Sequence, residues 1–108
     1  MVTDASMTVG YDSADTARIA LFGEIDMANA DEVEQQILGT IGNQLTAVTI
    51  DLSGLEYIDS AGLRVLFTLG NRLDVLQIAL RLVVPTGSSI RRVIDLSGMA
   101  AAIPVLSH

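Results

Sequence analysis

The side chains that could do chemistry in this chain are hydroxyls, carboxylates and guanidinium groups. The sequence contains no Cys, and its one His is His108. A chain without Cys has no disulfide, no thiolate nucleophile and no Cys-ligated zinc. With no second imidazole, Ser-His-Asp and Cys-His catalytic sites and most zinc hydrolase sites are excluded as well. No metal and no cofactor is therefore expected, and function falls to Ser, Asp, Glu and Arg.

One pair of such side chains, Asp59 and Ser60, stands where an apolar strand pattern gives way to a helix pattern. A helix start carries partial positive charge, so the Ser60 hydroxyl is expected at an electropositive tip. The small residues Ala61 and Gly62 follow, and Gly costs about 1 kcal/mol relative to Ala in a helix interior. They would leave the helix start open to another protein. The alternative is that Asp59 or Ser60 only caps the helix, which stabilises it by about 1 kcal/mol.

The composition limits the classes of partner. A chain of 108 residues fits one domain, which typically has about 100–200 residues, so residues 1–108 are expected to form a single domain. Six cationic residues, all Arg, against 13 acidic ones give a net charge of −7. This balance predicts no binding to nucleic acid or to an anionic membrane. An apolar content of 50% leaves self-association open.

The chain shows no pattern of a membrane protein. The longest stretch without charge covers residues 35–50 and contains Gly, Thr, Asn and Gln. It is too short and too polar for a membrane span, which takes about 20 apolar residues. The first residues have neither a cationic start nor an apolar run, so no signal peptide is visible. A cytoplasmic location is expected.

Alternating and helical patterns divide the chain into strands and helices. Strands are predicted over residues 7–11, 16–25, 47–52 and 78–84, and helices are predicted from Asn29, from Ser60 to about Leu76, and from Ser88 or Ser89. Asn29 is expected to cap the first helix together with Glu32, and Gly42 and Asn43 to end it. Residues 53–59 are expected to form a loop. Residues 103–106 are left as either a last strand or an extended tail.

The element order is ββαβαβα, which defines the predicted fold class as α/β. Strands that alternate with helices pair in parallel through right-handed crossovers. We therefore expect a mixed, largely parallel sheet with the helices packed mainly on one face. The apolar stripe of the second helix is expected at five positions: Leu63, Leu66, Phe67, Gly70 and Leu73.

Residues 51–63 read Asp-Leu-Ser-Gly-Leu-Glu-Tyr-Ile-Asp-Ser-Ala-Gly-Leu. This segment resembles the sequence motif of STAS domains, and in particular that of the bacterial anti-sigma factor antagonists. The segment Gly23-Glu24-Ile25-Asp26, followed by Ala28, is similar to the family's segment before its first helix. Residues 90–94 with Ser97 and Gly98 are similar to its C-terminal helix and turn. The resemblance covers nearly the whole chain in the family's order.

The resemblance implies a single STAS domain with a partner-switching function and no enzymatic activity of its own. In this family an anti-sigma factor with serine kinase activity phosphorylates the antagonist, and a metal-dependent serine phosphatase resets it. The unmodified antagonist binds the kinase and so releases a sigma factor. Carried over to this chain, Ser60 is the phosphoacceptor. The partner-binding residues expected around it are Asp26, Met27, Asp59, Ala61, Gly62 and Arg64.

Several residues keep a second interpretation. Arg64 either contacts a partner's acid or the phosphate, or lies on a solvated helix face. Met27 either adds apolar contact at the docking face or packs in the core. For the whole chain, the alternative function is a STAS accessory module of a transporter-associated or sensory complex without a sigma factor. A small nucleotide hydrolase is a third option, but Asp26, Asp59 and Ser60 are too few for such a site and no cationic clamp accompanies them.

Overall fold

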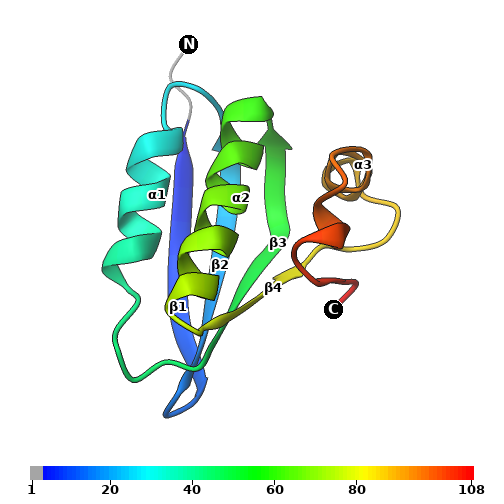
Figure 1. Ribbon diagram of the computed structural model, residues 1–108. Coiled ribbons are helices and arrows are strands. Elements are labelled where there is room, and N and C mark those ends of the chain that lie inside the picture. Colours follow the sequence, from blue (N-terminus) through cyan, green and yellow to red (C-terminus); the bar gives the residue numbers. More distant parts are fainter. Residues whose placement is uncertain (1–3) are drawn as a thin grey trace.

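The computed structural model describes residues 4–108, which form one five-stranded sheet with helices on it (Figure 1). The elements are β1 (Ala5–Ser13), β2 (Thr16–Ile25), α1 (Ala30–Gly39), β3 (Ala47–Ile58), α2 (Ser60–Val75), β4 (Ala79–Val83), α3 (Ser89–Leu96), a 3-10 turn (Met99–Ala101) and β5 (Val105–Leu106). The strands lie in the order β1-β2-β3-β4-β5. The β1–β2 pair is antiparallel and the other three pairs are parallel. The predicted α/β class is confirmed.

Strand β2 has the bounds that its alternation predicts. Ala17, Ile19 and Leu21 are almost fully buried, and the residues between them are at least partly exposed. Ile19 pairs with Ile50 of β3 on one side and with Val9 of β1 on the other. Because apolar residues alternate over this length, one face of the strand is buried and the register is fixed.

Strand β3 corrects one prediction, because residues 53–58 continue the strand instead of forming a loop. Two bulges each insert an extra residue into β3 relative to β2, one between Asp51 and Gly54 and one between Leu55 and Tyr57. A bulge breaks the period of two, so Leu55 and Ile58 are both buried although they stand three residues apart. The predicted end at Leu52 is the point where the alternation stops.

Helices α1 and α2 lie side by side over one face of the sheet (Figure 1). Helix α1 buries Val33 and Ile37 and ends at Gly39, one turn before the predicted stop at Gly42 and Asn43. Helix α2 begins at Ser60 as predicted, but its buried face is rotated. The fully buried positions on that face are Ala61, Gly62, Val65, Leu66, Leu69 and Leu73, whereas Leu63, Phe67 and Gly70 are only partly buried.

The C-terminal third follows the predicted order. Ser88 is the cap of α3, and its Oγ accepts a hydrogen bond from the Arg91 backbone N–H at 3.1 Å. The left-handed backbone of Gly98, with φ of 76°, follows the helix. Val105 and Leu106 pair in parallel with β4 as β5, so this segment is a strand rather than a free tail. Helix α3 packs beside β3 (Figure 1).

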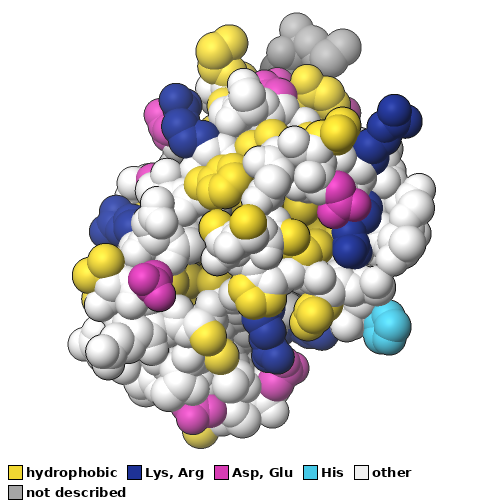
Figure 2. Space-filling view, turned by 45° about the vertical axis from the view of Figure 1, so that its right-hand side comes forward, with side chains coloured by type: hydrophobic (Ala, Val, Ile, Leu, Met, Phe, Trp, Pro, Cys, Tyr) yellow, Lys and Arg dark blue, Asp and Glu magenta, His cyan; other side chains and the backbone are white. Residues whose placement is uncertain are grey.

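One face of the molecule carries a band of hydrophobic side chains with most of the charged ones at its margins (Figure 2). Within residues 4–108, no helix has both the length and the apolar character that a bilayer span requires.

Candidate functional site

Asp59 caps α2 and sets the position of Ser60. The backbone of Asp59 is extended, with φ of −108° and ψ of −170°, between the end of β3 and the first residue of the helix. Its Oδ1 accepts hydrogen bonds from the backbone N–H groups of Ala61 at 2.9 Å and Gly62 at 3.2 Å. Of the two caps that the sequence left open, Asp59 is the one the structure uses. It satisfies two of the N–H groups that a helix start leaves without a partner.

The same carboxylate connects the helix to a loop that is distant in sequence. Its Oδ2 accepts a hydrogen bond from the Met27 backbone N–H at 3.3 Å. The Asp59 backbone N–H donates to the Ile25 carbonyl oxygen at 3.2 Å. The carboxyl ends of the neighbouring parallel strands β2 and β3 therefore bring the loop and the helix start together, at the top of the view in Figure 1.

The loop over residues 26–29 is held by Asn29, which corrects a second prediction. Its Oδ1 accepts from the Asp26 backbone N–H at 3.0 Å, and its Nδ2 donates to the Glu24 carbonyl oxygen at 2.9 Å. The expected capping pair with Glu32 is not formed, because the Asn29 side chain makes no hydrogen bond to the start of α1. Asp26 Oδ1 closes the loop further by accepting from the Ala28 N–H at 2.8 Å. The side chain that was expected to cap a helix instead shapes this loop.

The loop and the start of α2 together form a shallow hollow of about 310 Å³. Met27, Asp59, Ser60, Ala61 and Arg64 line it. Ser60 and Arg64 are exposed, and the Met27 side chain is 84% exposed. Core packing, the second interpretation of Met27, is therefore excluded. Asp26 lies next to the hollow in the same loop, so the structure brings together six of the seven expected site residues.

Gly62 is the exception among these residues. It is buried and faces the core, where an added Cβ would come within about 2.5 Å of Ile58 Cγ1 and 3.1 Å of Ile25 Cγ2. The expectation that this glycine leaves the surface open to a partner is wrong, because its missing side chain serves the packing of α2 on β2 and β3. Ala61 is also buried at 9% exposure, although it contributes to the floor of the hollow.

The arrangement offers an exposed hydroxyl that has no structural task. In the part of the chain that the structure describes, no group is hydrogen-bonded to the Ser60 Oγ. Both oxygens of the Asp59 carboxylate are engaged by backbone N–H groups, so this side chain acts as a structural acceptor. A hydroxyl of this kind is accessible to a modifying enzyme.

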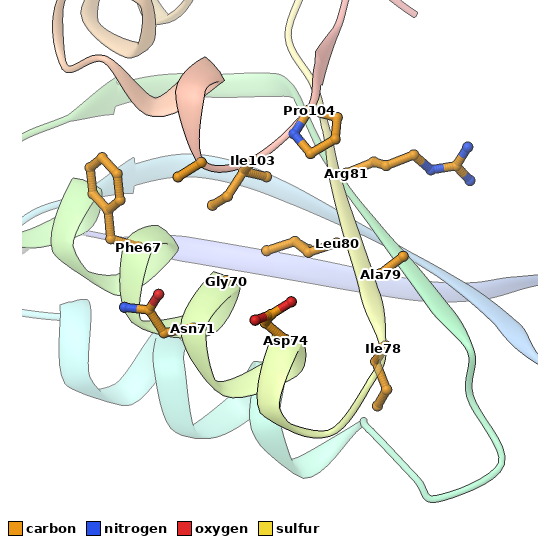
Figure 3. Close-up of a pocket in the computed structure, with 11 residues that line it drawn as sticks. Phe67, Gly70, Asn71, Asp74, Ile78, Ala79, Leu80, Arg81, Ile103 and Pro104 are labelled. Atoms are coloured by element: carbon orange, nitrogen blue, oxygen red, sulfur yellow. The ribbon is translucent and has the colours of Figure 1, made fainter.

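A second and larger hollow, of about 440 Å³, lies along the other half of α2 (Figure 3). Asn71 and Asp74 of the helix, Leu80 of β4, and Ile103 and Pro104 of the C-terminal segment line it, while the Arg81 side chain extends away from the others. Gly70 admits Ile103 here, since an added Cβ would lie 2.8 Å from Ile103 Cδ1. Sequence reasoning missed this hollow because it depends on how residues 102–104 return to the helix.

The chain is similar in sequence to proteins that are already known. The STAS domain family model matches residues 10–108. A Bordetella bronchiseptica protein described as the anti-sigma factor antagonist BtrV is 33% identical over 100 residues, which cover 92% of this chain and 85% of that protein. The anti-sigma-F factor antagonist RsfB of Mycobacterium tuberculosis is 35% identical over 83 residues, which cover 77% of this chain and 66% of RsfB.

The fold is shared with solved structures as well. The crystal structure of an anti-sigma factor antagonist from Mycobacterium paratuberculosis superposes with a TM-score of 0.83 at 28% identity, covering 97% of this chain and 87% of that one. BtrV, RsfB and this solved structure are thus all described as anti-sigma factor antagonists. The chain belongs to the STAS domain family, and the sequence relatives BtrV and RsfB are anti-sigma factor antagonists by their names.

Proposed function

We propose that the chain is a cytoplasmic anti-sigma factor antagonist, a single STAS domain that binds an anti-sigma factor with serine kinase activity and releases it when Ser60 is phosphorylated. The observation that carries this proposal is the exposed Ser60 hydroxyl at the first residue of α2, beside a loop that presents Met27. The antagonists BtrV and RsfB among the relatives support it.

The residues around Ser60 have the properties of a docking face. Met27 exposes 84% of its surface and offers a flexible apolar contact that adapts to a partner. Asp26 adds a carboxylate from the same loop, and Arg64 adds a cation from the exposed side of α2. Because Asp59 and Asn29 fasten the loop on both sides, the face is organised before a partner arrives, which lowers the entropy cost of binding.

The electrostatic effect of a phosphate on Ser60 is large enough to act as a switch. It adds about −1.5 to −2 charges at pH 7, next to the carboxylates of Asp59 and Asp26. Changing a 99:1 preference for the bound state into 1:99 takes about 5.5 kcal/mol. Like charges brought together in an interface cost several kcal/mol, so one phosphate supplies much of that amount. A metal-dependent serine phosphatase then resets the protein.

The fold is expected to survive the modification. Asp59, not Ser60, satisfies the N–H groups at the start of α2, so a phosphate on Ser60 replaces no hydrogen bond within residues 4–108. Release of the partner is therefore a property of the docking face and not of unfolding.

The test is a phosphorylation assay with candidate anti-sigma factor kinases and ATP, with the modified residue located by mass spectrometry. We expect phosphate on Ser60 in the wild-type protein and none in Ser60→Ala. The matched control is Ser89→Ala, because Ser89 is also an exposed serine at the first residue of a helix. This variant should be modified like the wild type.

Binding is measured in parallel by calorimetry against the same kinase. Ser60→Asp should bind at least about tenfold more weakly while its circular dichroism stays unchanged, because a tenfold loss corresponds to only about 1.4 kcal/mol. Phosphate on another residue, or full affinity of Ser60→Asp, would contradict the proposal. Co-purification with a membrane transporter, without a kinase, would favour the accessory module instead.

A further inference from the structure

Ser60 and Arg64 stand four residues apart at the start of α2, and both line the same hollow. Residues at this spacing lie on one side of a helix, with Cβ atoms about 5–6 Å apart. Both residues are exposed, so a group attached to the Ser60 hydroxyl and the guanidinium of Arg64 share the same small volume.

Two of the N–H groups that would bind an anion at this helix start are already occupied. Asp59 Oδ1 accepts from the N–H groups of Ala61 and Gly62, which would otherwise bind a phosphate. The neighbouring carboxylates of Asp59 and Asp26 repel a phosphate further. A cationic side chain is therefore the main source of counter-charge for a phosphate on Ser60.

Arg64 is the cation that fits this place. All six cationic residues of the chain are Arg, and Arg64 is the one that lines the hollow. The ion pairs found within residues 4–108 join Arg18 to Asp51 and Arg91 to Asp95, so Arg64 takes part in neither. A guanidinium presents two parallel N–H groups to a phosphate, which is the stronger form of such a contact.

We propose that Arg64 binds the phosphate of phosphorylated Ser60 within the same chain and so holds it, partly neutralised, over the docking face. This inference rests on the proposed phosphorylation of Ser60. Arg64 then has a role only in the phosphorylated protein, where it supplies the positive charge that pairs with the phosphate. Partner release then depends on the phosphate filling the hollow as well as on its remaining negative charge.

The test uses protein with phosphoserine inserted at position 60 during translation, so that no kinase is needed. The phosphoserine pKa is measured by ³¹P NMR at low salt in the wild type, in Arg64→Gln and in Arg64→Lys. Arg92→Gln is the matched control, since Arg92 is an exposed arginine on α3. The phosphate gains one unit of negative charge at its second pKa, and an ion pair of unit charges at this spacing corresponds to about 0.2 to 0.4 pKa units.

We expect the phosphoserine pKa to be lower by about 0.2 to 0.4 units in the wild type than in Arg64→Gln. Arg64→Lys should restore part of the difference, Arg92→Gln should leave it unchanged, and 0.5 M salt should reduce it. Equal pKa values in the wild type and Arg64→Gln overturn the inference, whatever the kinase assay shows. A failed kinase assay, in contrast, removes the proposed function and leaves this measurement intact.

Discussion

The two oxygens of the Asp59 carboxylate bind different parts of the chain, so their contributions can be removed one at a time. Oδ1 holds the N–H groups of Ala61 and Gly62, and Oδ2 holds that of Met27. Asp59→Asn keeps one oxygen for the helix and replaces the other with an NH₂ group, which accepts no hydrogen bond from Met27. Asp59→Ala removes both connections.

The expected cost follows from these contacts. Replacing a helix cap with Ala costs about 0.5–2 kcal/mol, and one lost hydrogen bond costs about 0.5–1.5 kcal/mol. Asp59→Ala should therefore lower the free energy of unfolding by roughly 1.5–2.5 kcal/mol, which corresponds to a fall in Tm of roughly 6–20 °C for a domain of this size. Asp59→Asn should lower the free energy of unfolding by only about 0.5–1 kcal/mol, because it loses the hydrogen bond from Met27 while Asn is an equally good cap.

Urea unfolding followed by circular dichroism gives the free energies, and amide hydrogen exchange measured by NMR gives the location of the loss. In Asp59→Asn the Met27 amide should exchange faster while the Gly62 amide keeps its protection. In Asp59→Ala both should exchange faster. Ser88→Ala is the control, because it removes the cap of α3 and should leave the Met27 amide as it is. The reasoning is refuted if the Met27 amide of Asp59→Asn exchanges as slowly as in the wild type. It is also refuted if Asp59→Ala lowers the free energy of unfolding by less than about 0.3 kcal/mol.

Three further predictions concern the same region. Gly62→Ala should destabilise the protein by about 1–3 kcal/mol in urea unfolding, because the new methyl group meets Ile58. The control is Gly39→Ala, where an added Cβ has no neighbour within 4 Å, and it should be neutral or stabilise by up to about 1 kcal/mol. Equal effects of the two substitutions would contradict the packing argument. Asn29→Ala loses two hydrogen bonds of the loop and should cost about 1–3 kcal/mol with faster exchange of the Asp26 amide; an unchanged exchange rate would show that the side chain does not hold the loop. Met27→Gln should change stability by less than about 0.5 kcal/mol yet weaken binding of the anti-sigma factor in calorimetry, and unaltered affinity would remove Met27 from the docking face.

The sequence predicts well those elements whose pattern is undisturbed. Strand β2 has an alternation that no bulge interrupts, and both of its bounds are confirmed. The start of α2 at Ser60 is also confirmed. It could be predicted because Asp is a preferred cap directly before a helix. The two bulges of β3 could not be predicted, since they depend on the pairing with β2 and interrupt the alternation that marks a strand.

The candidate site was predictable in its residues but only partly in its geometry. Ser60 and Asp59 are adjacent in the sequence, whereas the hydrogen bond from Met27 to Asp59 spans 32 residues and exists because β2 and β3 are neighbours. The local pattern predicts the wrong role for Asn29, because its side chain bonds to the Asp26 N–H and the Glu24 carbonyl oxygen, which only the folded loop brings within reach. The packing role of Gly62 escapes the sequence for a related reason, since its close neighbours Ile25 and Ile58 belong to other elements.

In the proposed phosphorylation cycle, the division of tasks between Asp59 and Ser60 has a consequence for how fast the protein responds. Asp59 fastens the helix, so adding or removing a group at Ser60 requires no rearrangement of the backbone. The delay between signal and response is then governed by the turnover of the modifying enzymes and by partner dissociation. A signalling component built in this way can pass through many cycles without exposing its interior to proteases or to aggregation.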